Sequence, residues 1–427
     1  MSLAFNLLLA CIIFASGSAV HDGSAAQSLI AALAGVALAC VTVAARAADV
    51  KFASLVAGGL KYAAAVPAIL MVLQLLPVPF GAHSIWAYAN DALGRRFWGH
   101  ITVDLGATVL ALAFYLATIS LVLVSVFVAK DRRRAELLLL VLTAATSITP
   151  LILLAGKWGL IAAPGDTNDV LAAVSALGIL LSLTSAVRAI ERHNSGSAEA
   201  AGSTKLQVLL VASGVAVLIC LGGLATSATP NVALIAAFGV IVFASLQVIR
   251  RIRLAGWATG ILVATMIVAA VMIILWRYDA ARTLSPLLQF AAAASPDTIS
   301  IAQRLLSDAG PLGTGAGSYV ALLPIYQDLD GSVARAPSTA AALAIELGWP
   351  MALLSIGIAV WLVVIFYRAA LARGRDSFYP AAAAACTIVM FGQAFCDASL
   401  SDSCVAVVGA TTIGLGLAQS VSSRDGR

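Results

Sequence analysis

The chain has few charged residues for its length. Asp, Glu, Lys and Arg make up only 11% of its 427 residues, whereas a soluble globular domain carries roughly 25%. This low charge excludes a soluble globular protein. The 61% of hydrophobic residues instead indicates one integral membrane domain over residues 1–427, with helices that cross the bilayer several times.

Residue patterns that bind metals or nucleotides are also lacking. The four histidines (His21, His83, His100 and His193) are scattered, and the chain contains neither an HExxH nor a CxxC motif. We therefore expect no metal and no cofactor. The six cysteines lie in or beside apolar runs, which is typical of small buried side chains. A disulfide between Cys396 and Cys404, which flank one short loop, stays open.

The positive charge of the chain predicts its topology. The 25 Lys and Arg residues exceed the 20 Asp and Glu residues by five, but they stand in short clusters between apolar runs, so nucleic acid is not an expected partner. When alternate loops are assigned to opposite sides, most of the cations fall on one side. The positive-inside rule then places both termini in the cytoplasm.

Apolar runs long enough to cross a bilayer predict about twelve transmembrane helices. Residues 1–6 contain no Lys or Arg, so we expect the first run to be a retained span and not a signal peptide. The predicted spans are 3–19, 27–45, 54–77, 105–129, 135–155, 170–187, 206–226, 232–249, 257–276, 350–367, 379–395 and 404–419.

Three loops stand out from the short ones. A first periplasmic loop is predicted at 78–104, a flexible cytoplasmic linker at 191–203, and a large periplasmic loop at 277–349, between helices 9 and 10. Long loops frequently carry function, so the candidate site is expected in 277–349.

The large loop begins with a predicted amphipathic helix. Ser295 and Pro296 are typical of a helix start, and Gly310 of a stop. Arg304 and Asp308 stand four residues apart, as in a helical ion pair. Arg304 is thus either half of a surface pair or a ligand for an anion.

A glycine-rich motif follows, in which Gly313, Gly315 and Gly317 alternate with other residues before Ser318 and Tyr319. No Gly-Lys-Ser/Thr ending follows, and no strand precedes, so nucleotide-binding loops are excluded. The motif predicts a tight turn or a nest of amides that binds an anion.

A second short helix is predicted from Ser338 to Leu347. Glu346 lies at its end, directly before the break at Gly348. This carboxylate is either exposed to lipid headgroups or bound to an Arg or a sugar hydroxyl.

The order of these features resembles the O-antigen ligase/polymerase superfamily of bacterial envelope glycosyltransferases. The shared pattern is about a dozen spans, a large outer loop with an Arg (Arg304), a GxGxG turn, and an ExG sequence that enters the next span (Glu346 to Gly348). Residues 83–86 and 101–104 also resemble the family's first outer loop. Ligases of the family carry a His-Asn pair where this chain has Pro337 and Ser338, which favours a polymerase-like or diverged role.

The resemblance implies a metal-independent glycosyltransferase in the bacterial inner membrane. Its substrate would be an undecaprenyl-pyrophosphate-linked oligosaccharide of O-antigen, capsule or exopolysaccharide, and other polysaccharide assembly proteins are potential partners. The implied catalytic residues are Arg304, Glu346 and Asp308. The implied substrate-binding residues are Arg277, Arg282, Gly313, Gly315, Gly317, Ser318, Tyr319 and Arg335.

Two alternatives stay open from the sequence. One is a transporter or lipid flippase. Charged residues are nearly absent from the predicted spans, where only Lys61 and Glu136 fall, which counts against ion-coupled transport but not against passive movement. The other is a non-catalytic accessory subunit of a polysaccharide assembly complex.

Overall fold

The protein is an all-α polytopic membrane protein, as predicted. Its structure, a computed structural model, describes residues 1–20, 23–77, 81–94, 98–160, 167–194, 201–227, 229–252, 285, 287–291, 294–327, 335–372 and 376–420. Across these ranges the chain is helical and forms no strand. Eight of the described helices are long and apolar enough to cross a membrane, and the bent pair α3 and α4 makes a ninth if it is one span.

The described helices correspond to eleven of the twelve predicted apolar runs, but those at Ser2–Ser18 and Ser403–Ala418 are shorter apolar helices. The predicted span 257–276 lies outside the described residues, so the count of twelve stays a prediction. The bounds of the described helices are α1 (Ser2–Ser18), α2 (Ser24–Ala44), α3 (Ala47–Ala57), α4 (Leu60–Leu75), α5 (Ile85–Leu93), α6 (Leu105–Val128), α7 (Arg132–Lys157), α8 (Asn168–Asn194), α9 (Ala201–Thr226), α10 (Pro230–Ile252), α12 (Pro296–Asp308), α13 (Tyr319–Tyr326), α14 (Thr339–Glu346), α15 (Trp349–Ala372), α16 (Phe378–Cys396), the 3₁₀ turn η1 (Ser399–Ser401) and α17 (Ser403–Ala418).

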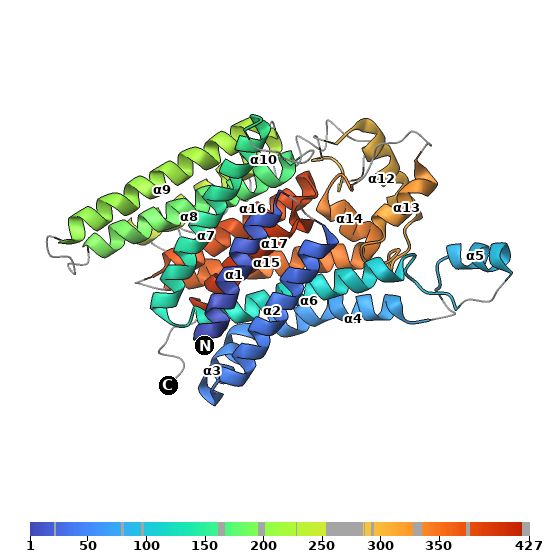
Figure 1. The fold of residues 1–427 in the computed structure, drawn as a ribbon, viewed down its shortest axis with the longest axis horizontal. Coiled ribbons are helices and arrows are strands. Elements are labelled where there is room, and N and C mark those ends of the chain that lie inside the picture. Colours follow the sequence, from blue (N-terminus) through green and yellow to red (C-terminus); the bar gives the residue numbers. More distant parts are fainter. Residues whose placement is uncertain are drawn as a thin grey trace.

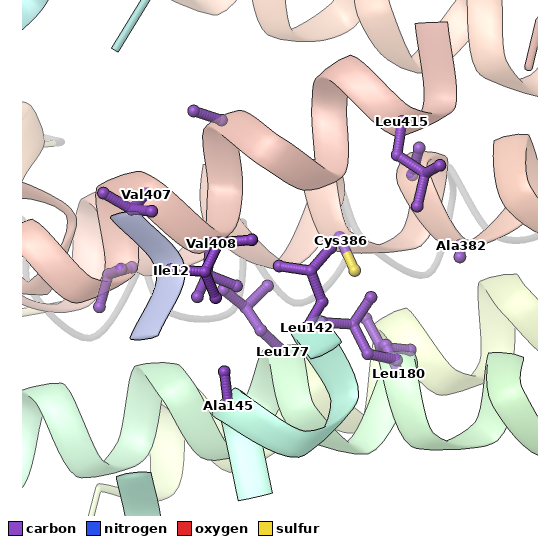
Figure 2. Packing of buried hydrophobic residues seen from close by; sticks show 14 of the residues in the cluster. Ile12, Leu142, Ala145, Leu177, Leu180, Ala382, Cys386, Val407, Val408 and Leu415 are labelled. Atoms are coloured by element: carbon purple, nitrogen blue, oxygen red, sulfur yellow. The ribbon is translucent and has the colours of Figure 1, made fainter. Parts of the chain in front are cut away.

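The core of the bundle lies between α1, α7, α8, α16 and α17 (Figure 2). One buried side chain from each of these five helices meets there, and each is at most 1% exposed: Ile12, Leu142, Leu177, Cys386 and Val408. The spanning part of α8 is 83% buried, against 22% for α2 and α15. Helix α8 is therefore central, while α2 and α15 present most of their surface outward, as lipid-facing helices do.

The third predicted span is broken. Residues 54–77 were expected to form one helix, but α3 ends and α4 begins at the pair Gly58 and Gly59. Gly58 has a φ of +41°, and a Cβ at Gly59 would lie 2.6 Å from the Trp361 ring. Two residues without side chains allow the turn and the close approach of α15.

Ion pairs gather at one end of the bundle. The Glu136 carboxylate on α7 accepts a hydrogen bond from the Arg188 guanidinium at 3.0 Å. It also forms ion pairs with Arg132 and Arg192. Arg188 is only 6% exposed. The sixth span was predicted to end at residue 187, but α8 continues to Asn194 and carries Arg188 inside the bundle. The other ion pairs among the described residues also lie at this end.

Two smaller expectations are also resolved. The predicted linker 191–203 is helical at both ends, since α8 reaches Asn194 and α9 starts at Ala201; residues 195–200 lie outside the described ranges. No disulfide joins the described cysteines, Cys396 and Cys404 included, and all but Cys40 are buried.

Helices α12, α13 and α14 form a cap at the other end of the bundle, with α5 beside them (Figure 1). Ser295 caps α12 by accepting the amide of Thr298, and Ser338 caps α14 by accepting that of Ala341, both at 3.2 Å. Both helix starts were predicted. The cap has its own small apolar core, formed by Ile301, Leu305, Tyr319, Leu322, Leu323 and Ile345.

Candidate functional site

The glycine motif forms a tight turn that fits against α14 and the first long loop. Gly313, Gly315 and Gly317 have φ angles of +72°, +111° and +74°. A Cβ at Gly313 would collide with the Glu346 carbonyl, and one at Gly315 with Thr102. The amides of Thr314 and Gly315 donate to the carbonyls of Ile345 and Glu346, each at 3.0 Å. These glycines therefore permit close backbone packing, and their amides are bound within the protein, those of Gly313 and Gly315 to carbonyls and that of Gly317 to the Glu346 carboxyl.

Gln74, at the end of α4, connects the turn to the bundle. Its Nε2 donates to the carbonyl oxygens of Leu312 at 2.8 Å and Glu346 at 2.9 Å. Its Oε1 accepts the amide of Ala316 at 3.1 Å. The side chain is fully buried, and nearly all of its hydrogen-bonding capacity is used.

The first long loop completes this assembly. The amide of Val103 donates to the Thr314 carbonyl, and the Thr108 hydroxyl donates to the Ala316 carbonyl, both at 2.9 Å. The hydroxyl oxygens of Thr102 and Thr108 lie 2.7 Å apart. The Thr102 carbonyl accepts a hydrogen bond from the Trp86 indole N–H at 3.0 Å. We call this assembly the glycine junction; it comprises Gln74, residues 102–108, residues 312–319 and residues 346–348.

Glu346 belongs to the glycine junction, and no Arg of the described residues forms an ion pair with it. Its Oε1 accepts the amide of Tyr319 at 3.2 Å. Burial raises the pKa of this carboxyl to about 7, and hydrogen bonds from the Gly317 and Tyr319 amides oppose that rise. The side chain thus binds the start of α13, which makes Glu346 a positioning residue in this structure.

Ser318 and Tyr319 are also buried in the junction. The Ser318 hydroxyl donates to the Gly315 carbonyl at 2.6 Å and lies 2.9 Å from the Thr314 hydroxyl. Burial and the nearby Glu346 raise the pKa of Tyr319 to about 12. Neither side chain is exposed enough to bind a substrate, since Ser318 is 0% and Tyr319 3% exposed.

A pocket of about 220 Å³ lies beside the glycine junction, between the two long loops. His83, Ser84, Ile85 and Tyr88 line it from the first loop and α5. The second loop supplies Leu305, Asp308 and Ala309 from α12 and the residue after it, Thr314 from the turn, and Leu322, Ile325 and Tyr326 from α13.

Asp308 and Tyr326 are paired at this pocket. The Tyr326 hydroxyl donates to Asp308 Oδ2 at 2.7 Å, and burial together with this bond raises the pKa of Tyr326 to about 12. Of the two alternatives for Arg304, the ion pair with Asp308 is not formed, and Asp308 is bound by Tyr326 of α13 instead. Arg304 is exposed on α12, and its guanidinium has no ion pair within the described residues.

His83 has a fixed orientation at the pocket. Its amide donates to the His100 carbonyl at 2.9 Å, and its Nδ1 accepts the Ile85 amide at 3.3 Å. Burial lowers the pKa of His83. The neutral ring therefore carries its proton on Nε2, which remains a hydrogen-bond donor.

The other predicted site residues are separated or undescribed. Arg335 is exposed, three residues before the cap of α14. Arg277 and Arg282 lie outside the described residues. Within the described ranges, no group of His, Cys, Asp and Glu side chains is arranged to hold a metal ion.

Sequence reasoning missed Gln74, Tyr326 and the helices α5 and α13. Gln74 is one polar residue in an apolar run, and only that isolation could have indicated a buried role. Neither the protein-family models nor the curated proteins compared with the chain give a match.

Proposed function

We propose that the protein is a membrane glycosyltransferase that transfers or polymerises undecaprenyl-pyrophosphate-linked oligosaccharide in surface polysaccharide synthesis. One observation carries this proposal: the three segments whose motifs resemble the O-antigen ligase/polymerase superfamily meet in the glycine junction. Residues 102–108, 312–319 and 346–348 are distant in sequence but hydrogen-bonded to one another. A pocket opens next to them.

The proposed reaction needs positioning and charge more than a metal. A hydroxyl oxygen of the acceptor sugar attacks the anomeric carbon of the donor sugar, and the bond from that carbon to the pyrophosphate oxygen breaks. Undecaprenyl pyrophosphate leaves with the bonding electron pair, and the hydroxyl proton passes to a carboxylate, Asp308 or Glu346. Arg304, together with Arg277, Arg282 and Arg335, would bind the pyrophosphate charge.

The charge distribution supports the orientation that this reaction requires. The ion pairs among the described residues lie at the end opposite to the cap. Under the positive-inside rule that end is cytoplasmic. The pocket and the glycine junction then face the periplasm of a bacterial inner membrane, where lipid-linked glycan would be available.

Chain extension by the purified protein tests the proposal. With lipid-linked oligosaccharide and no added metal, we expect longer glycans by gel electrophoresis. Arg304→Ala should lower the rate roughly 10- to 100-fold, as expected for loss of a charge-assisted hydrogen bond of about 1.5–3 kcal/mol. Arg304→Lys should retain an intermediate rate, because charge is kept and the planar fork is lost.

A matched control uses an Arg at the other end of the bundle. Arg133 is exposed at the start of α7, so Arg133→Ala should leave the rate unchanged. Full activity of both Arg304 variants would remove this residue from the site. Unchanged surface polysaccharide in a clean gene deletion, with no extension in vitro, would refute the function itself.

A further inference from the structure

The pocket beside the glycine junction has the composition of a site for a sugar ring. We propose that it binds one neutral hexose or hexosamine unit of the acceptor glycan, with Asp308 accepting a sugar hydroxyl and His83 Nε2 donating to another. This inference rests on the proposed function and names, within it, where the acceptor lies. It also selects Asp308 over Glu346 as the carboxylate that contacts the substrate.

The size of the pocket fits one ring. Its volume of about 220 Å³ is below the roughly 300–1,000 Å³ of pockets that enclose drug-sized molecules. An oligosaccharide would have to extend out of it into solvent. The pocket lies between loops, so the remaining sugars could continue outward without crossing the bundle.

The walls match both surfaces of a sugar. Leu305, Leu322 and Ile325 provide an apolar side for ring C–H groups. Tyr88 is 73% exposed, which leaves an aromatic face free for stacking. Ring hydroxyls would meet the polar side formed by His83, Ser84, Asp308, Thr314 and Tyr326.

The hydrogen-bonding capacity of the polar side remains partly unused. The Tyr326 hydroxyl holds Asp308 through Oδ2, and Oδ1 has no hydrogen-bond partner among the described residues. His83 Nδ1 is occupied by the Ile85 amide, which directs its Nε2–H elsewhere. One strong acceptor and one donor, each held by a neighbour, are what two adjacent hydroxyls require.

The charge of the described pocket lining disfavours an anion. Among the described residues no Lys or Arg lines it, and Asp308 is the one acidic side chain of that described lining. A phosphate or a uronic acid would meet a carboxylate without a compensating cation. Arg304, one helical turn before Asp308 on α12, is exposed and does not line the pocket, so the proposed anion-binding position lies next to the sugar position on the same helix.

Saturation-transfer NMR on the full chain in nanodiscs tests this assignment. The probes are methyl glucoside, methyl galactoside, methyl mannoside and methyl N-acetylglucosaminide, with methyl glucuronide as the charged comparison. We expect at least one neutral glycoside to bind, and the glucuronide to bind at least several-fold more weakly. Asp308→Ala should weaken binding at least tenfold, because it removes a charge-assisted hydrogen bond.

Two variants control this experiment. Asp297→Ala removes another exposed acid of α12 that does not line the pocket, and it should bind the glycosides normally. Tyr326→Phe keeps the ring but releases Asp308 Oδ2, and it should weaken binding roughly three- to tenfold even if Asp308→Ala fails to fold.

The results separate this inference from the proposed function. Absence of binding by all four neutral glycosides, equal binding by Asp308→Ala, or preferred binding of the glucuronide would overturn it, even in a protein that extends glycan chains. Binding that depends on Asp308 in a protein unable to extend chains would support the sugar site and count against the transferase.

Discussion

At the scale of single residues, two buried carboxyls determine how the cap responds to pH. Burial raises the pKa of Glu346 and of Asp397 to about 7 in each case. The Asp397 carbonyl accepts the amide of Thr339 at 2.8 Å, so Asp397 and Glu346 lie at opposite ends of α14. A folded-state pKa above the unfolded value means that the folded chain binds the extra proton.

The cap should therefore lose stability as pH rises from about 5 to 8. For Glu346 the loss is at most about 3 kcal/mol, since a tenfold change in proton affinity corresponds to about 1.4 kcal/mol. Glu346→Gln still accepts the Tyr319 amide but cannot ionise. Its thermal unfolding midpoint in detergent should exceed that of the unchanged chain at pH 8 and depend less on pH.

Asp397→Asn serves as the matched comparison for this effect. Asp397→Asn alone should keep the part of the pH dependence of stability that comes from Glu346. The double variant, Glu346→Gln with Asp397→Asn, should lose the parts that come from both carboxyls. If Glu346→Gln leaves the pH dependence intact, the carboxyl is ionised in the fold across this range.

At the scale of elements, the sequence predicts helix starts well and helix partners poorly. Ser295 and Ser338 were recognised because capping depends on residues three positions apart. The contact of Gln74 with Leu312 joins residues 238 positions apart, and no local pattern contains it. Helix α13 was missed because Pro324 interrupts the helical pattern that Tyr319–Tyr326 nonetheless adopts.

Helix α4 should be coupled to the glycine turn through Gln74. Gln74→Ala leaves the Ala316 amide and the Leu312 carbonyl without their Gln74 partner, while the Glu346 carbonyl keeps the Gly315 amide. The cost is about 1–3 kcal/mol for each buried group that stays unpaired. We expect faster hydrogen exchange in a peptide that covers residues 312–318, measured by mass spectrometry. Gln207→Ala on α9 changes an exposed glutamine and should leave that exchange unchanged.

Equal protection of residues 312–318 in Gln74→Ala would mean that the turn holds its shape through Thr314, Gly315 and α14 alone. The candidate site would then depend less on the bundle than the hydrogen bonds indicate.

At the scale of the whole molecule, apolar run length was sufficient to predict an all-α polytopic membrane protein, and eight or nine of the twelve predicted spans are described helices long and apolar enough to cross a membrane. A helix must satisfy its own backbone within the bilayer, so twenty apolar residues in a row permit little else. The same rule could not place Arg188, because a cation at the end of an apolar run is normally outside the membrane. Here Glu136 on the neighbouring helix α7 accepts it, and pairing across helices is invisible to a count along one segment.

Cysteine labelling in cells tests the orientation of the bundle. Ser300 is exposed on α12 at the cap, and Arg133 is exposed at the opposite end. A maleimide that cannot cross the inner membrane should label Ser300→Cys in cells with a permeabilised outer membrane. It should label Arg133→Cys only after lysis, because the cation-rich end faces the cytoplasm. The reverse pattern would invert the bundle and place the pocket away from periplasmic glycan.

The glycine junction is assembled largely from main-chain atoms. Carbonyls and amides of residues 314–316 and 345–346 make most of its bonds, and every residue type except proline carries both groups. The frame therefore prescribes glycine at a few positions and little else nearby. Side chains of the adjoining pocket can be exchanged without dismantling that frame, so one scaffold could be fitted to different sugars by changes confined to α5, α12 and α13.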